Sequence, residues 1–359
     1  VGPGTVTVDG AGSTWNNSGR LHLGGFGGST LAVSGGASVV NDGGAAIGRL
    51  SSSTSTVTIA GPGSTWTNGS EIIVGDEGDG TLIVTGGAIV ANNYWAAIGY
   101  GSGSNGAVTV EGTGSTWSNS GVLWVGLSGD GTLAVTEGAS VTIGGDEASI
   151  GSYAGSTGTV TIAGTGSTLI TTYDLSVGYY GSATMEITGG GLVSVGGTLM
   201  IDYDTDGDGF VNMAGGAMLA LFGDADDSLS QFLGLISGSD AIRYWDVTTD
   251  DWAPITGATP GVDYTLAHIG DAGANLYGYT LLTVGTISQP VPGDANGDGK
   301  VDDEDAKTLA AHWGQAGGWA AGDFNNDGVI NALDAAIMAA NWGHGVGETT
   351  ESAVPEPSA

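Results

Sequence analysis

Residues 57–82 read VTIAGPGSTWTNGSEIIVGDEGDGTL, and the frame of this stretch recurs along residues 1–222. Short strand-like runs at 57–59, 64–66 and 72–74 are separated by Gly, Asn, Asp and Ser. The position of Val57 recurs every 25 to 27 residues, at Val6, Leu31, Val57, Leu82, Val108, Leu133, Val160, Met185 and Val211. A fixed period in this range indicates a repeat architecture whose units stack on one another.

Three runs and three turns in each unit predict one coil of a triangular solenoid. Alternating Val, Ile and Leu suit strands with one buried face, and recurrent glycines, as in Gly86-Gly87-Ala88, suit tight corners. A propeller blade needs about 40 residues for four strands, so a 25-residue unit is too short for one. We therefore expect a mainly β fold: a parallel, right-handed β-solenoid of about nine coils over residues 1–222, roughly 40 Å long at a coil spacing of about 4.8 Å.

Alternate units resemble each other more closely, because GSTW recurs at Trp15, Trp66 and Trp117 and GSTL follows at Leu169, at steps of 51 or 52 residues. These tryptophans are interpreted as a ladder that stabilises the coil, since repeat proteins place like residues at like positions for packing. The alternative is an aromatic strip that binds sugar.

Composition narrows the possible partners. The chain has 359 residues, 71 of them Gly and none Cys, and 38 Asp plus Glu against 5 Lys plus Arg give a net charge of −33. This charge repels nucleic acid and anionic membranes and favours cations. No apolar run reaches the length of about 18 residues that a membrane helix needs, so we expect no membrane span in this chain.

The end of the repeats carries two further features. The eighth unit holds an acidic turn with Asp202, Asp204, Asp206 and Asp208, which either binds a third Ca²⁺ or is a solvated turn. Residues 223–288 are predicted to cap the solenoid with a helix, whose apolar positions are Leu229, Phe232, Leu233 and Ile236, and with strands near 242–247 and 279–284. A short linker at 289–293 follows.

Residues 294–343 contain a second duplication with an offset of 29 residues. Each copy has oxygen-bearing side chains at loop positions 1, 3, 5, 9 and 12, Gly at 6, and a residue at 7 that offers its carbonyl, which is the ligand layout of a 12-residue calcium loop. The predicted ligands are Asp294, Asn296, Asp298, Lys300, Asp302 and Asp305 in one loop, and Asp323, Asn325, Asp327, Val329, Asn331 and Asp334 in the other.

One helix follows each loop in this prediction, at 303–313 and 333–342. We expect Leu309 to pack with Trp313, and Leu333 to pack with Ile337 and Met338. Because these side chains form little core by themselves, we expect Ca²⁺ to drive the folding of the module.

The double loop and helix resembles the type I dockerin of bacterial extracellular complexes, with Asp at position 12 where an EF-hand loop usually has Glu. The resemblance implies binding of a cohesin partner through positions 10 and 11, which are Asp303 and Glu304 in one copy and Ala332 and Leu333 in the other. Because the copies differ there, symmetric two-way docking is in doubt.

The tail, residues 344–359, contains the motif VPEPS at 354–358, which resembles the start of a PEP-CTERM sorting signal. The 25-residue repeats are similar to the autotransporter-like and PEP-CTERM-associated repeats of secreted bacterial surface proteins. Both resemblances imply a protein at the cell surface or released from it.

Catalysis is not expected. A polysaccharide lyase needs basic residues that bind acidic sugar and remove a proton, and the repeat register does not cluster the few basic residues, although Arg20 and His22 could face the same side. We therefore interpret the chain as a non-catalytic structural or adhesive protein, stabilised by calcium, that self-assembles into a fibre or layer. The alternative is a carbohydrate-binding or polysaccharide-degrading subunit, recruited by dockerin–cohesin docking.

Overall fold

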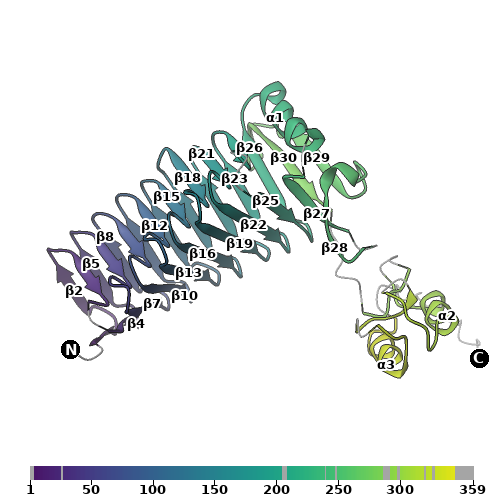
Figure 1. The fold of residues 1–359 in the computed structure, drawn as a ribbon, viewed down its shortest axis with the longest axis horizontal. Helices are drawn as coiled ribbons and strands as arrows, with labels where there is room; N and C mark the ends of the chain where they lie inside the picture. Colours follow the sequence, from purple (N-terminus) through teal and green to yellow (C-terminus); the bar gives the residue numbers. More distant parts are fainter. Residues whose placement is uncertain are drawn as a thin grey trace, which may run out of the picture. The chain divides into compact units, whose positions relative to one another are not determined.

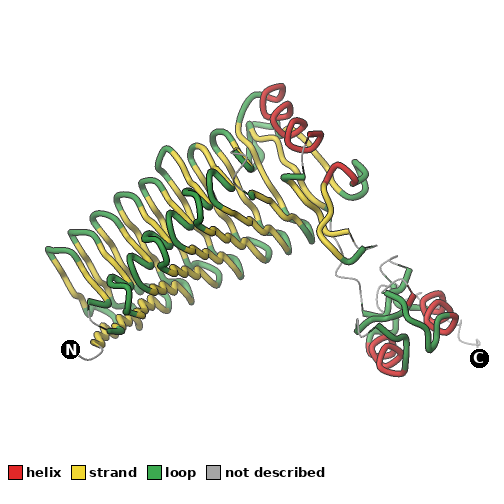
Figure 2. Tube along the Cα trace, viewed as in Figure 1, coloured by secondary structure: helices red, strands yellow, loops and turns green. Residues whose placement is uncertain are grey.

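The computed structural model describes residues 4–25, 27–203, 208–238, 240–246, 249–285, 292–296, 300–318, 321–325 and 328–343. The chain divides into two compact units, Val1–Thr286 and Ile287–Ala359. The first is a β-solenoid closed at its C-terminal end by a helix and further strands, and the second is a small helical module (Figures 1 and 2). No helix of the described residues is long and apolar enough to cross a membrane.

Each coil contributes one strand to each of three parallel sheets, here called A, B and C. The coil strands of sheet A are β1 Gly4–Asp9, β4 Ser29–Ser34, β7 Thr54–Ala60, β10 Asp79–Thr85, β13 Asn105–Glu111, β16 Asp130–Thr136, β19 Thr157–Ala163, β22 Ser182–Thr188 and β25 Gly209–Met213. Those of sheet B are β2 Thr14–Asn17, β5 Ser38–Asn41, β8 Thr65–Asn68, β11 Ile89–Asn92, β14 Thr116–Asn119, β17 Ser140–Ile143, β20 Thr168–Thr171, β23 Leu192–Val195 and β26 Met218–Phe222. Sheet C consists of β3 Leu21–Leu23, β6 Ala45–Ile47, β9 Ile72–Val74, β12 Ala96–Ile98, β15 Leu123–Val125, β18 Glu147–Ile150, β21 Asp174–Val177 and β24 Leu199–Ile201.

The predicted fold class and coil register are confirmed. The marker residues pair from coil to coil in one unbroken series, from Val6 with Leu31 through Val57 and Leu82 to Met185 with Val211. The corner glycines also take the expected role, since Gly86 and Gly87 have φ values of 64° and 83°, which side-chain-bearing residues rarely adopt.

The tryptophans of the repeats lie inside the coil. Trp66 and Trp117 are 0% exposed, and Trp15 in the first coil is partly buried. The prediction that they stack on one another is wrong, because Val39 and Val90 occupy the same position in the coils between them. A buried ring cannot stack on a sugar, so this column is part of the core and not a sugar-binding strip.

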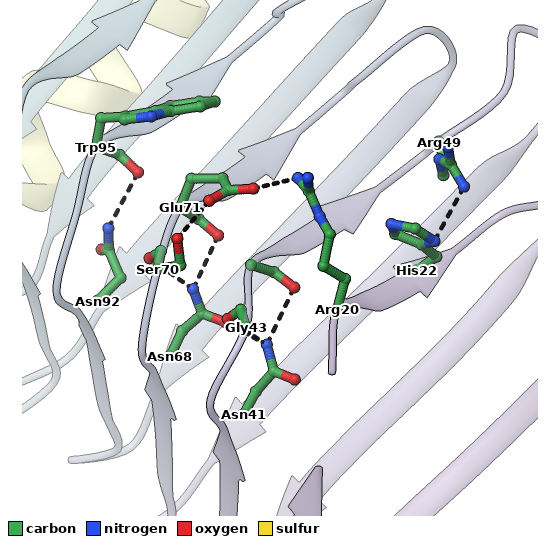
Figure 3. Close-up of polar contacts among 11 residues, drawn as sticks. Arg20, His22, Asn41, Gly43, Arg49, Asn68, Ser70, Glu71, Asn92 and Trp95 are labelled. Atoms are coloured by element: carbon green, nitrogen blue, oxygen red, sulfur yellow. Dashed lines mark hydrogen bonds and ion pairs between the residues drawn. The ribbon is translucent and has the colours of Figure 1, made fainter. Parts of the chain in front are cut away.

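A column of asparagines at the end of the sheet B strands was not anticipated from the sequence. Asn17, Asn41, Asn68, Asn92 and Asn119 occupy equivalent positions in the first five coils. Their amides donate along the column, as from Asn41 Nδ2 to Asn68 Oδ1 at 2.6 Å, and also to the next corner, as from Asn68 Nδ2 to the Glu71 carbonyl at 2.8 Å (Figure 3). The asparagine amides thus satisfy the carbonyls of the next corner, which are largely buried from the second coil onward.

The C-terminal end of the solenoid is covered by α1 Ala225–Gly238, β27 Ile242–Asp246, β28 Asp251–Pro254, the short 3₁₀-helix η1 Ile255–Gly257, β29 Tyr264–His268 and β30 Tyr279–Val284. Strand β30 pairs antiparallel with β26, which ends the parallel stacking of sheet B. Phe232 and Ile236 of α1 join the core, whereas Leu233, another of the predicted apolar positions of this helix, is 49% exposed.

Candidate functional site

The second unit is built from two copies of one pattern, related by the 29-residue offset. Its helices are α2 Asp303–Ala311 and α3 Ala332–Ala340. The core contains three equivalent pairs, which are Ala295 with Phe324, Val301 with Ile330, and Leu309 with Met338. The backbone repeats this symmetry, since Gly314 N donates to the Ile330 carbonyl at 2.8 Å and Gly343 N donates to the Val301 carbonyl at 2.9 Å.

This core corrects the predicted packing between the helices. Leu309, Met338 and Ile337 are buried or partly buried, but Leu333 is 61% exposed. Trp313 and Trp342 lie beyond the ends of α2 and α3 and are 51% and 52% exposed. The core instead uses loop positions 2 and 8, so it is larger than the sequence analysis allowed.

The first and last positions of each loop carry buried carboxylates. Asp294, Asp305, Asp323 and Asp334 are each 0% or 1% exposed. In the first loop Asp305 Oδ1 accepts hydrogen bonds from the N–H groups of Ala295 at 2.9 Å and Asn296 at 3.2 Å, which ties the end of the loop to its start. Asp334 Oδ1 accepts in the same way from Phe324 N at 2.8 Å and Asn325 N at 3.3 Å.

Positions 9 and 12 have a second role that the sequence analysis missed. Asp302 and Asn331 are the N-caps of α2 and α3, and each forms a capping box with the acid three residues later. Asp305 Oδ2 accepts from Asp302 N at 2.9 Å, and Asp334 Oδ2 accepts from Asn331 N at 2.8 Å. The signal was present in the sequence as Asp or Asn followed three residues later by an acid, just before an apolar run.

The structure places only some of the predicted ligands. Asp298 and Asp327, at position 5, lie outside the described residues, whereas Asn296 and Asn325, at position 3, are described and exposed. At the sharp turn of the second loop Gly328 has φ 84° and its N–H donates to Asp323 Oδ2 at 2.9 Å. In the described part of the chain no three Asp, Glu, His or Cys side chains gather as a metal site. Besides the end carboxylates, the predicted donors described are the side chains of Asp302 and of the loop asparagines and the carbonyls of Lys300 and Val329.

The residues predicted to bind a partner lie on the first turns of the two helices. Asp303, Glu304, Ala332 and Leu333 are all exposed. The two copies therefore present different chemistry at equivalent places, with two carboxylates on α2 and an apolar pair on α3. Val329 adds to the apolar side, because it is 46% exposed and precedes α3.

The acidic turn of the eighth coil is only partly described. Asp204 and Asp206 lie outside the described residues, and so does the tail with its VPEPS motif. Asp202 has a positive φ of 54°, and its N–H donates to the Val177 carbonyl at 2.9 Å. A third Ca²⁺ at this turn stays a prediction.

Basic residues do cluster on the first coils, contrary to the sequence analysis. Arg20 and His22 share the outer side of sheet C, and Arg49 Nη1 lies 3.0 Å from His22 Nδ1 (Figure 3). The carboxylate of Glu71 lies over Gly44 and forms an ion pair with Arg20, and its other oxygen accepts from Ser70 Oγ. Burial and the two guanidinium groups lower the pKa of His22.

Comparison with known proteins agrees with the repeat geometry of the second unit. Residues 292–341 match the dockerin type I domain. No curated protein and no solved structure matches the chain. Domains of this type typically bind Ca²⁺ and dock to a cohesin, and the proteins that carry them are generally extracellular or at the cell surface.

The Glu71 ion pair leads to a prediction about acid stability. Burial raises the pKa of Glu71, but hydrogen bonds from Ser70 and its own backbone and the Arg20 guanidinium outweigh burial and lower it. A lowered folded-state pKa stabilises the protein above the ordinary Glu value of about 4.3, and this stabilisation disappears as the pH falls through the folded-state pKa. We expect Glu71→Gln to lose about 1 kcal/mol at pH 7, since Arg20 is half exposed and screened.

Thermal unfolding of the wild type and Glu71→Gln from pH 7 down to pH 3 measures this difference. The two midpoints should converge at the acidic end. Glu77→Gln, which removes an exposed carboxylate from the neighbouring corner, should unfold like the wild type throughout. A gap between the wild type and Glu71→Gln that persists unchanged at pH 3 would show that the charge of Glu71 is not the source of the effect.

Proposed function

We propose that the chain is a non-catalytic, extracellular structural or adhesive protein, in which a rigid β-solenoid is attached to a cohesin-type partner by a calcium-loaded dockerin module. The observation that carries the proposal is the internally symmetric double loop and helix, which matches the dockerin type I domain over residues 292–341. The solenoid supplies a continuous core along its length, which suits a spacer.

Calcium is the cation that the loops suit best. Each loop buries carboxylates at positions 1 and 12, and burying charge in this way is costly unless an opposite charge is near. The other predicted donors are oxygens of amides, backbone carbonyls and carboxylates, which Ca²⁺ prefers over softer nitrogen or sulfur ligands. The metal would supply positive charge between the two ends of each loop, while Asp305 and Asp334 hold those ends together.

Replacing one buried acid should remove one calcium site. We expect isothermal titration of the full chain to give two Ca²⁺ per molecule from the two loops, and Asp294→Ala or Asp323→Ala to bind one fewer than the wild type. Asp303→Ala, which removes an exposed acid at position 10 of the first loop, should bind as many Ca²⁺ as the wild type. Binding to the folded state should also stabilise the module by about 2.7 kcal/mol at a Ca²⁺ concentration 100 times the Kd. Absence of Ca²⁺ binding at millimolar concentration would contradict the proposal.

The second copy offers the better docking surface. Interface centres are depleted in Asp and Glu and are built around apolar anchors. Leu333 is 61% exposed at the start of α3, next to Ala332 and Val329, whereas the equivalent places on α2 carry Asp303 and Glu304. We therefore expect the partner to dock in one orientation, on the side of α3.

A charge placed on this apolar anchor should disrupt docking. Against recombinant type I cohesin domains, Leu333→Asp should weaken binding at least tenfold, since burying an unpaired carboxylate is unfavourable. Glu304→Ala is the matched change on α2 and should leave binding within about twofold. Calcium binding by both variants should stay intact, because both side chains are exposed. If Glu304→Ala loses cohesin binding and Leu333→Asp keeps it, the partner docks on the first copy instead.

Self-assembly of the solenoid into a fibre or layer stays a prediction. Stacked coils present backbone hydrogen-bonding groups at an unpaired edge, which another strand can extend, and head-to-tail contacts that do not close give filaments. Electron microscopy with Ca²⁺ and then with chelator tests it. Calcium-dependent filaments would support assembly through the double loops, and single particles in both conditions would refute it.

The second candidate function is a carbohydrate-binding subunit recruited by docking. The buried Trp66 and Trp117 argue against the strip proposed from the sequence. A different set of aromatic residues, on the outside of sheet C, favours this function. Polysaccharide degradation has no comparable observation in its favour.

A further inference from the structure

The outer surface of sheet C is organised in three columns, which run from coil to coil. The middle column is the central residue of each strand: His22, Ala46, Ile73, Ala97, Trp124, Ser149, Ser176 and Met200. One flanking column precedes the strands and includes Trp95, Glu147 and Asp174. The other follows the corner residue of each coil, which is Gly99, Gly151, Gly178 or Asp202, and includes Tyr100, Ser152, Tyr179 and Tyr203. Backbone hydrogen bonds join successive corners, as from Tyr179 N to the Gly151 carbonyl at 3.1 Å.

Aromatic rings from all three columns meet over the fourth and fifth coils. Trp95 and Tyr100 stack across the strand, with ring centroids 6.0 Å apart and an interplanar angle of 18°. The ring centroid of Trp124, in the next coil, lies 5.7 Å from that of Trp95. Ala97, between the two flanking columns, is 0% exposed although it lies outside the core cluster. These rings therefore cover the strand, while Tyr100 keeps 38% of its surface exposed.

A second aromatic cluster lies on the seventh and eighth coils. Tyr179 and Tyr203 stack at 4.7 Å with an interplanar angle of 13°, and Tyr180 meets Tyr179 edge to face at 4.5 Å. Tyr180 and Tyr203 are 37% and 57% exposed. Each cluster thus presents aromatic surface to solvent at places fixed by the coil register.

The surface between the clusters is polar. Ser149 and Ser152 share a hydrogen bond of 2.9 Å, and Ser176 Oγ donates to Glu147 Oε1 at 3.3 Å. Glu147 and Asp174 are neighbours in the flanking column. Burial, only partly offset by the Ser176 hydrogen bond, raises the pKa of Glu147. The three serines are themselves buried, at 2%, 5% and 0% exposure for Ser149, Ser152 and Ser176. The polar groups that reach the surface between the two aromatic clusters are therefore the partly exposed carboxylates of Glu147 and Asp174.

The chemistry of this outer face of sheet C indicates which ligand it can bind. Sugar rings present apolar faces, which stack on aromatic rings, and hydroxyl edges, which donate to carboxylates and hydroxyls. A net charge of −33 repels polyanions and therefore favours a neutral polysaccharide over an acidic one. The coil spacing of about 4.8 Å is close to the advance per sugar of an extended polysaccharide, so successive coils can meet successive sugars.

We propose that the outer face of sheet C, from Trp95 to Tyr203, binds an extended neutral polysaccharide, with the two aromatic clusters stacking on sugar rings and the carboxylates of Glu147 and Asp174 between them accepting hydrogen bonds from its hydroxyls. This site lies in the solenoid and goes beyond the docking function of the second unit. It provides the adhesive contact that a docked spacer would present to a cell wall or a substrate.

Affinity electrophoresis of the full chain with Ca²⁺ tests the proposal, with soluble xyloglucan, galactomannan and mixed-linkage β-glucan in the gel and polygalacturonate as the anionic comparison. We expect at least one neutral polysaccharide to retard the wild type. Trp124→Ala and Tyr179→Ala should each weaken that binding about tenfold, and Trp124→Phe, which keeps a ring, should retain most of it.

Tyr277→Ala is the matched control, because Tyr277 is also exposed, at 55%, but lies in the turn between β29 and β30. It should bind like the wild type. Circular dichroism and cohesin binding should be unchanged in all variants, which separates loss of the glycan site from misfolding and from failure of docking. Three outcomes would overturn the proposal: no retardation by any neutral polysaccharide, unaltered binding by both alanine variants, or a concentration-dependent dimer that Trp124→Ala abolishes.

Discussion

The coil-to-coil backbone hydrogen-bond ladder is the constraint on which the rest of the structure depends. Because each strand pairs in parallel with its equivalent one coil away, every residue position becomes a column along the solenoid. A column repeats the same environment at each level, so a residue that suits one coil suits the next. The buried Val, Ile and Leu columns, the asparagine column and the outer aromatic clusters are all consequences of this single register.

Most of the fold could be predicted because the pairing of the coils follows directly from the regular spacing of equivalent residues in the sequence. The spacing of Val57 and its equivalents gave the pairing of all nine coils, and the offset of 29 gave the symmetry of the second unit. The period did not indicate whether a particular tryptophan points into the core or to solvent. The side chain of Trp66, on sheet B, points into the core and is 0% exposed, whereas that of Trp124 lies on the outer face of sheet C.

The candidate sites show the same division. Loop positions are read from spacing alone, and the acids at the first and last positions of each loop are buried, while their role as calcium ligands stays a prediction. The additional role of Asp302 and Asp305 in a capping box depends on where the helix begins, which the loop motif does not state. The Arg20–Glu71 pair joins residues two coils apart across Gly44, and only the stacking of coils makes them neighbours.

The antiparallel pairing of β30 with β26 has a mechanical consequence. A chain held through its C-terminal unit would carry tension into the solenoid through β30 and the rest of the capping region before any coil is loaded. Strands lie across the long axis of a solenoid, so force along that axis would peel coils apart one by one and would not shear a whole sheet at once. In a chain attached through its second unit, the pairing of β30 with β26 would therefore be the first contact to bear load, and its strength would set the force at which coils begin to separate.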